Sequence, residues 1–125
     1  MNRSGIRDDP DFLLGIELFN SGRYWHAHEA WERLWLVAEG PRREFLQGLI
    51  QLAAACHHVL RGNLRGAQRL LDASLARLDL FPSLEEGIDL QALRESAAAL
   101  RDRFDPDPAA VSPDRPAPLP RIDRR

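Results

Sequence analysis

The sequence predicts an all-α protein, a single compact bundle of about five helices with a proline-rich C-terminal tail. Apolar residues recur three and four positions apart along most of the chain, which is the spacing of one face of an α-helix. Glycine, proline, asparagine and aspartate stand between these stretches, where helices begin and end. With 125 residues the chain is long enough for one modest core but too short for two.

The first helix is predicted to begin at Asp9-Pro10 and to end at Ser21-Gly22. Aspartate caps a helix with its side chain, proline suits the first turn, and glycine commonly follows the last turn. The second helix is predicted over residues 24–39. Its apolar face consists of aromatic, leucine and alanine side chains: Tyr24, Ala27, Trp31, Leu34, Trp35 and Ala38. We expect the tryptophans on this face to be core residues.

The other three helices have similar boundary signals. The third is predicted to begin at Gly40-Pro41, and the fourth begins after Gly62-Asn63. Phe81-Pro82-Ser83 interrupts the helical pattern, and Asp89 is the expected cap of the fifth helix.

These boundaries divide the chain into a flexible N-terminus over residues 1–8, a helical bundle domain over 9–104 and a tail over 105–125. Six of the nine prolines lie in the tail, which is therefore predicted to be extended or disordered. Leu119 and Ile122 are its sizeable apolar residues near the end, so docking of the tail onto the bundle would use them.

Composition excludes several classes of protein. The net charge of −2 does not favour a general affinity for nucleic acid or anionic membranes, and no apolar run reaches the length of a membrane span. The polar first nine residues do not resemble a secretory signal. The lone Cys56 has no partner for an internal disulfide and is predicted to be a buried, inert thiol. We expect a soluble cytoplasmic protein.

The richest stretch is FNSGRYWHAHEAWERLW, from Phe19 to Trp35. On the second helix His28 lies within the apolar face, with Glu29 and Glu32 on its flank, so these groups need partners. On the third helix Gln47 and Gln51 flank Gly48, which would let another helix approach closely. We therefore predict that both glutamines face His28 and Glu32 across a helix pair. The predicted polar pocket comprises six residues: Trp25, His28, Glu29, Glu32, Gln47 and Gln51.

Three blocks in order, FNSGRYWHAHEAWERLW, GPRREFLQGLIQLAAA and GNLRGAQRLL, resemble domain of unknown function family 309. These are small, all-helical, mostly bacterial proteins, and the resemblance covers about residues 9 to 100. The resemblance implies a helical bundle and a motif centred on six residues: His28, Glu29, Glu32, Gln47, Gly48 and Gln51. It implies no activity.

Two chemical interpretations of the motif compete with structural ones. The run from His28 to Glu32 copies the start of the zinc motif H-E-x-x-H but has glutamate where the second histidine belongs. A divalent metal such as zinc would need a third ligand, with His58, Glu44 and His57 as candidates. We favour instead a buried network in which His28 and Glu32 bond to each other and to Gln47 or Gln51.

The second interpretation is acid–base chemistry by Glu29 and Glu32, which are neighbours on the helix surface. The alternative is a solvated edge with Arg33 and Arg23 as counter-ions. Likewise Arg43 is expected to pair with Glu39 or Glu44.

Three hypotheses of function remain open. The first is a binding or interaction protein whose pocket holds a small polar ligand, an ion or ordered water. The second is a metal-dependent hydrolase-like enzyme with His28 and Glu32 as ligands and Glu29 as base. The third is a structural protein–protein module. The expected partner is a small polar ligand or a protein, a second copy of the chain included; the Trp25 side chain is the tryptophan expected to touch it.

Overall fold

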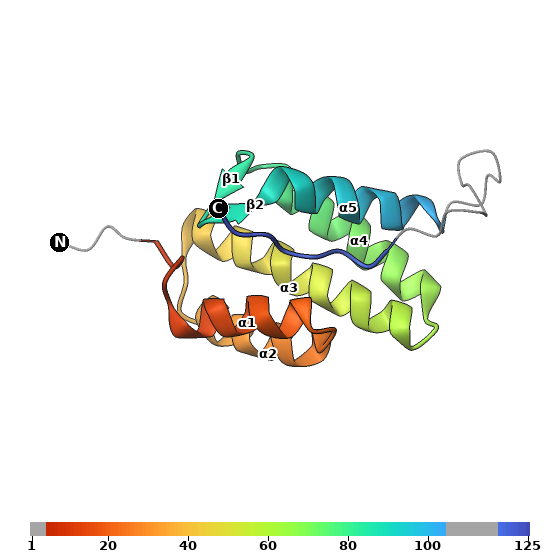
Figure 1. The fold of residues 1–125 in the computed structure, drawn as a ribbon, viewed down its shortest axis with the longest axis horizontal. Helices are drawn as coiled ribbons and strands as arrows, with labels where there is room; N and C mark the ends of the chain where they lie inside the picture. Colours follow the sequence, from red (N-terminus) through yellow and green to blue (C-terminus); the bar gives the residue numbers. More distant parts are fainter. Residues whose placement is uncertain (1–4, 105–117) are drawn as a thin grey trace.

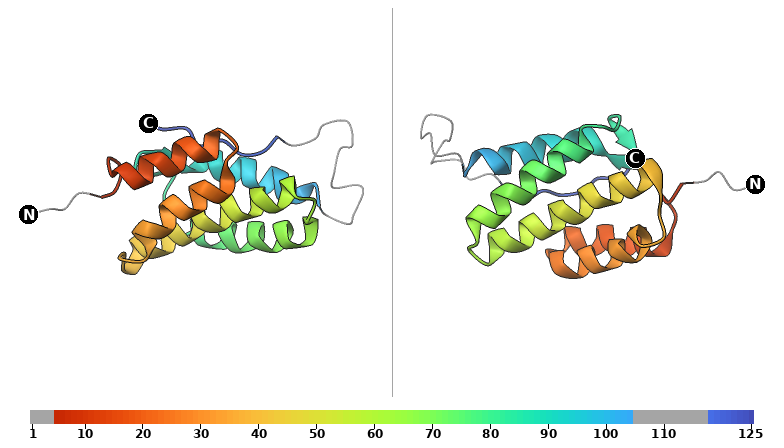
Figure 2. Two further views of the ribbon diagram at one scale, coloured as in Figure 1. Left: turned by 90° about the horizontal axis from the view of Figure 1, so that it is seen from below. Right: turned by 180° about the vertical axis from the view of Figure 1, so that it is seen from behind.

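The prediction of an all-α fold is confirmed by a computed structural model, which describes residues 5–104 and 118–125. Within these residues the elements follow one another as α1 (Pro10–Asn20), α2 (Tyr24–Trp35), α3 (Gly40–Leu60), α4 (Leu64–Leu78), β1 (Leu84–Glu85), β2 (Ile88–Asp89) and α5 (Leu90–Asp102). Each helix packs on the next in the sequence, so the α1–α2 pair covers one side of α3 and α4 covers the other (Figures 1 and 2). None of these helices is long and apolar enough to cross a membrane.

The predicted helix caps are present. The Asp9 side chain accepts hydrogen bonds from the backbone N–H groups of Asp11 and Phe12, at 2.8 and 3.4 Å, at the start of α1. Asn63 and Asp89 cap α4 and α5 in the same way. These bonds satisfy N–H groups that have no partner within the helix, so the local sequence is sufficient to set where the helices begin.

The second helix is shorter than predicted, because α2 ends at Trp35 and not at residue 39. After Trp35 the backbone bonds from Val37 and Ala38 reach back three residues, to Leu34 and Trp35, so the last turn tightens and the helix stops. Leu36 and Val37 are then exposed, and the chain turns into α3.

A small hairpin between α4 and α5 was not predicted. Strands β1 and β2 pair antiparallel through a two-residue turn at Glu86 and Gly87, with φ of +49° and +79°. Positive φ at both positions is the signature of a type I′ turn, which matches the twist of paired strands.

Both ends of the described chain pack against this hairpin. Ile6, in the predicted flexible N-terminus, is buried in the core, and its N–H donates to Glu86 Oε1 at 2.7 Å. Ile122 is 1% exposed and Leu119 packs on the core, which is the docking expected of the tail. Most of the predicted extended or disordered tail, residues 105–117, lies outside the described residues.

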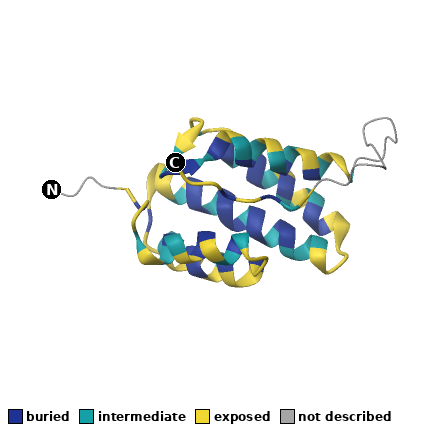
Figure 3. Ribbon diagram, viewed as in Figure 1, coloured by how far each residue is buried: buried dark blue, intermediate teal, exposed yellow. Residues whose placement is uncertain are grey.

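Trp31 lies in the core, where it is fully buried and donates from Nε1 to the Phe12 carbonyl at 3.2 Å. Buried residues, dark blue in Figure 3, run along α3 in the middle of the bundle. The α1 backbone comes close to the indole at Gly15, where a Cβ atom would overlap the ring. Trp35 is only partly buried. Cys56 is a buried free thiol, as predicted, and desolvation by burial raises its pKa to about 12.

Candidate functional site

A half-exposed aromatic surface lies where the start of α2 meets the end of α3, which run antiparallel (Figure 2). The Trp25 indole stacks on the His28 imidazole, with ring centroids 4.7 Å apart and planes at 19°. It also contacts His57 of α3, at 5.2 Å between centroids and 43° between planes. Trp25 remains 47% exposed. We call Trp25, His28 and His57 the Trp25 platform.

The platform continues toward the turn between α3 and α4. His58 lies beside His57, with ring centroids 5.9 Å apart, and its Nδ1 is 3.1 Å from Asn63 Nδ2, which places the acceptor role on this imidazole nitrogen. Leu60, one turn after His57 on the same side of α3, is 61% exposed, and Leu64 at the start of α4 is 48% exposed. Large apolar side chains therefore extend the exposed aromatic surface.

The electrostatics keep His57 uncharged more readily than an ordinary histidine. Desolvation by partial burial lowers its pKa, and the positive charge of Arg61 acts in the same direction, as do the nearby His58 and His28. A neutral imidazole contributes to the platform as an aromatic ring and not as a cation.

The glutamates of the motif separate into two pairs. His28 Nε2 lies 3.5 Å from Glu32 Oε2, and His26 Nδ1 lies 3.1 Å from Glu29 Oε1. Both carboxylates are about half exposed, at 51% for Glu29 and 48% for Glu32. Glu29 is therefore paired with His26, which takes no part in the platform. This arrangement does not position Glu29 as a base beside the His28–Glu32 pair.

The prediction that arginines neutralise these carboxylates is wrong for Arg33, which pairs with Asp11 of α1 at 3.1 Å. Nor does His28 complete a satisfied buried network, because its Nδ1 is buried without a hydrogen-bond partner among the described residues. The pair that sequence suggested is formed, but at the edge of solvent.

The prediction that Gln51 faces His28 and Glu32 is wrong. Its Oε1 accepts from Arg77 Nη1 of α4 at 3.5 Å. Gly48 does allow a close helix approach, as expected, but the neighbour is α4, whose Ser74 hydroxyl donates to the Gly48 carbonyl at 2.7 Å. Gln47 lies one helical turn before Gln51 on this side of α3. The side of α3 that meets α2 carries His57 instead.

The donor set does not fit a zinc ion. His28 and Glu32 supply two ligands, but His58 is bonded to Asn63 and Glu44 pairs with Arg77 at 3.1 Å. No group of three or more histidine, cysteine, aspartate or glutamate side chains is arranged to hold a metal within residues 5–104 and 118–125. A zinc site needs at least three protein ligands.

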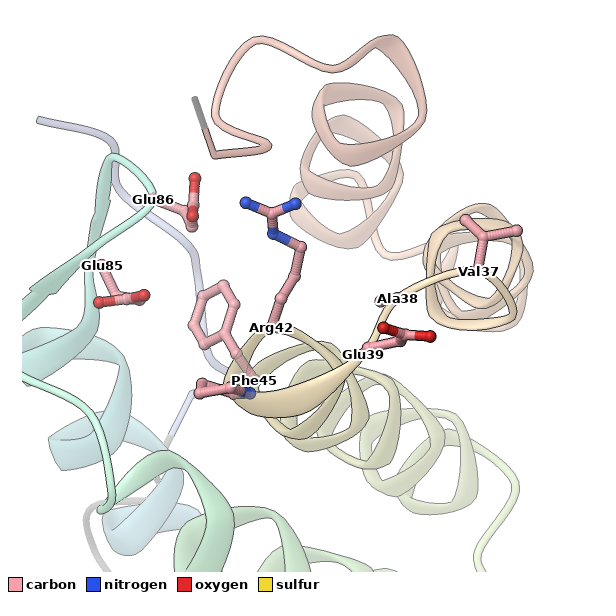
Figure 4. A pocket seen from close by; sticks show the side chains of 8 residues that line it. Val37, Ala38, Glu39, Arg42, Phe45, Glu85 and Glu86 are labelled. Carbon is pink, nitrogen blue, oxygen red and sulfur yellow. The ribbon is translucent and has the colours of Figure 1, made fainter. Parts of the chain in front are cut away.

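A cavity of about 540 Å³ lies at the opposite end of α2, between the start of α3 and the hairpin. In Figure 4 the Arg42 side chain and the Phe45 ring rise from α3 on one side, and Glu85 and Glu86 lie across from them on the hairpin. Desolvation raises the pKa of Glu85, and the neighbouring charge of Glu86 adds to the effect. Sequence reasoning missed this cavity because its far wall is the unpredicted hairpin.

Arg43 lies beside this end of the molecule. Its guanidinium carbon is 3.8 Å from the centroid of the Trp35 ring, and it donates to the Ala38 carbonyl at 3.4 Å. The expected pairing with Glu39 or Glu44 is therefore replaced by a cation–π contact, which covers the partly buried indole.

Comparisons with known proteins match this chain to a family model and to solved structures. The family model described as "Domain of unknown function (DUF309)" matches residues 12–70, a range that includes most of α1, all of α2 and α3, and thus the whole Trp25 platform. The chain is also similar to the crystal structure of a conserved hypothetical protein from Thermus thermophilus. The two share 39% sequence identity with a TM-score of 0.63 over 76% of this chain and 96% of that chain. No curated protein sequence matches.

Proposed function

The chain belongs to the family of the domain of unknown function DUF309, whose name assigns no activity, and we propose that it is a binding protein that recognises a protein partner through the Trp25 platform.

The observation that supports this proposal is the state of Trp25, which is held in place and yet exposed. Trp31, six residues later on the same helix, is fully buried, as a tryptophan that serves only the core would be. Trp25 leaves 47% of its surface to solvent while His28 and His57 fix its ring. An indole already ordered in the free protein loses little conformational entropy on binding, and tryptophan is among the residues most enriched at the energetic centres of interfaces.

The surroundings also have the composition of an interface. Leu60 and Leu64 enlarge the apolar area next to the platform, and Glu29 and Glu32 provide a polar, exposed border. Interfaces combine an apolar centre with a polar rim in this way. Trp25, Leu60 and Leu64 are each about half exposed or more, which suits contact with the side chains of a protein partner.

The hydrolase hypothesis receives less support. It requires Glu29 to act on a water held by His28 and Glu32, but Glu29 pairs with His26, and the described residues supply no third ligand. The third hypothesis, a structural protein–protein module whose polar network only specifies the fold, also involves a protein partner, but the network it assumes is incomplete because His28 Nδ1 has no hydrogen-bond partner among the described residues.

The test begins with a photo-crosslinking amino acid introduced in place of Leu60, and the protein that it attaches is identified by mass spectrometry. This partner is then purified, and its affinity for the unmodified chain and for Trp25→Ala is measured by titration calorimetry. We expect Trp25→Ala to weaken binding by about 2 kcal/mol, or roughly 30-fold, because the central anchor is lost.

Leu14→Ala is the matched control, since Leu14 is a 39% exposed apolar residue on α1. It should leave the affinity unchanged. Equal affinity of the purified partner for the unmodified chain and Trp25→Ala would refute the proposal, and so would equal losses for both variants.

A further inference from the structure

Residues 118–125, which we call the strap, bind the bundle as a ligand would. In Figure 1 the strap crosses the face of the bundle between α5 and α1 and ends at the hairpin. Pro120 and Ile122 are its buried residues, and Ile122 joins the hydrophobic core although it lies far in sequence from α1.

The first contact is with the backbone of the strap. Asn20, the last residue of α1, donates from Nδ2 to the Ile122 carbonyl at 2.8 Å and accepts from the Ile122 N–H at 2.8 Å. One amide side chain thus satisfies both backbone groups of one residue, as a neighbouring strand would. Such paired bonds recognise an extended main chain whatever its side chains are.

The second set of contacts adds the strap to the hairpin. The Asp89 N–H donates to the Asp123 carbonyl at 2.8 Å, and the Arg125 N–H donates to the Gly87 carbonyl at 2.7 Å. Ile88 and Arg124 form an antiparallel bridge between these bonds. This is strand addition at the edge of a sheet, a common mode of peptide recognition.

The third contact is specific for arginine. Both Nε and Nη2 of Arg125 donate to Asp89 Oδ2, at 3.1 and 2.5 Å. Arg7 and Arg124 add one bond each between the strap and the N-terminal segment, from Arg7 Nη2 to the Arg125 main-chain oxygen and from Arg124 Nη2 to the Arg7 carbonyl. The bundle therefore contacts two side chains of the strap, which are the buried Ile122 and, three positions later, Arg125.

We propose that the groove lined by Asn20 and the edge of β2 is a binding site for an extended peptide carrying an apolar residue followed three positions later by arginine, and that a second copy of this chain can supply that peptide as its own residues 118–125. This inference does not depend on the Trp25 platform, with which it shares no residue.

The connection between bundle and strap makes exchange between copies feasible. Thirteen residues, 105–117, join Phe104 to Pro118. Because the strap belongs to the same chain, its binding is intramolecular, so the chain's own strap occupies the groove in dilute solution. A strap from another copy competes only when the resident strap is weakened or the protein is concentrated.

The first experiment uses the full chain carrying Ile122→Asp, which releases the resident strap and leaves every groove residue unchanged. The probe is a fluorescent peptide of sequence PLPRIDRR, followed by anisotropy. We expect it to bind this variant roughly 100-fold more tightly than the unmodified chain, because the tethered competitor is gone. Adding Asn20→Ala to the variant should abolish binding, as should placing aspartate at the isoleucine position of the peptide.

The second experiment mixes two full-length variants that are defective in different parts. Asn20→Ala has a damaged groove but an intact strap, and Ile122→Asp has the reverse. Each should sediment as a monomer alone, and the mixture should form a one-to-one dimer. A monomeric mixture would overturn the assignment of a second copy as partner, and failure of the peptide to bind folded Ile122→Asp would overturn the site itself.

Hydrogen exchange on the unmodified chain covers the case in which Ile122→Asp does not fold. The amides of Ile122, Asp89 and Arg125 bond across the strap, so they should exchange together and faster than those in the centre of α3. Exchange of these amides only at the rate of global unfolding would mean that the strap never leaves the groove, and the proposal would fail.

Discussion

Gly48→Ala tests how closely α3 and α4 are packed. A Cβ atom at Gly48 would lie 2.7 Å from Leu78 Cδ2 and 3.1 Å from Leu78 Cγ, closer than carbon atoms approach without strain. Leu78 is fully buried, so its side chain has little room to turn away. Nor does α4 withdraw freely, because the buried bond from Ser74 to the Gly48 carbonyl would stretch.

Two effects of opposite sign decide the magnitude. Alanine is favoured over glycine in a helix interior by about 1 kcal/mol. Forcing a methyl group into a filled core costs about 1–3 kcal/mol. Since both the Leu78 contact and the Ser74 bond resist relaxation, we expect the second effect to prevail and the free energy of unfolding to fall by about 1 kcal/mol.

Urea unfolding of four proteins in a double-mutant cycle provides the assay. Leu78→Ala alone should cost about 2–5 kcal/mol, but it removes the side chain with which the new methyl collides. In that background Gly48→Ala should therefore be stabilising by about 1 kcal/mol, which is the helix preference alone. Ala54→Gly in the same helix measures that preference independently. The reasoning is refuted if Gly48→Ala has the same sign in both backgrounds.

Two further predictions concern the aromatic residues of α2 and their neighbour on α3. Trp31→Phe removes the buried donor to the Phe12 carbonyl and should lower the free energy of unfolding by about 2 kcal/mol. Trp25→Phe changes a half-exposed ring and should alter this free energy by less than about 0.5 kcal/mol. Equal effects of the two variants in thermal unfolding would contradict this difference. Burial, aided by Arg61, lowers the pKa of His57, so the folded protein binds this proton more weakly than the unfolded chain. The stability that neutral His57 provides is therefore fully present above the ordinary histidine pKa of 6.5 and is lost as the pH falls below that value. His57→Gln should reduce the fall in the free energy of unfolding on the acid side. An unchanged dependence of this free energy on pH, measured by urea unfolding, would contradict the prediction.

The helices could be predicted because their signals are local. Asp9, Asn63 and Asp89 each bond to N–H groups two or three residues ahead, so the information needed lies within one turn of the chain. The end of α2 was misjudged because Leu36 and Val37 continue the apolar character of the helix while lying outside it. Composition alone does not distinguish such residues from a last helical turn.

The candidate site could be predicted only in part, because a helical pattern gives the direction of a side chain but not the neighbour in that direction. Gly48 was correctly assigned to a close approach between helices, but nothing near it in the sequence distinguishes α2 from α4 as the partner. Once α4 occupies that side, Gln51 meets Arg77, and His57 becomes the residue opposite Trp25. The contact between Trp25 and His28 could be predicted from the sequence, because both residues belong to one helix.

The hairpin could not be predicted for a different reason. The cavity at the start of α3 and the site where the strap binds were missed with it. Its strands have two residues each, too short for an alternating pattern, and its turn has Glu86 at a position where asparagine or aspartate is expected before glycine. A left-handed conformation costs such a residue on the order of 1 kcal/mol. The bond from the Ile6 N–H to the Glu86 carboxylate, 80 positions away in the chain, offsets that cost. A long-range contact thus stabilises a turn that the local sequence disfavours. The same hairpin then forms one wall of the cavity at the start of α3 and the edge to which the strap binds.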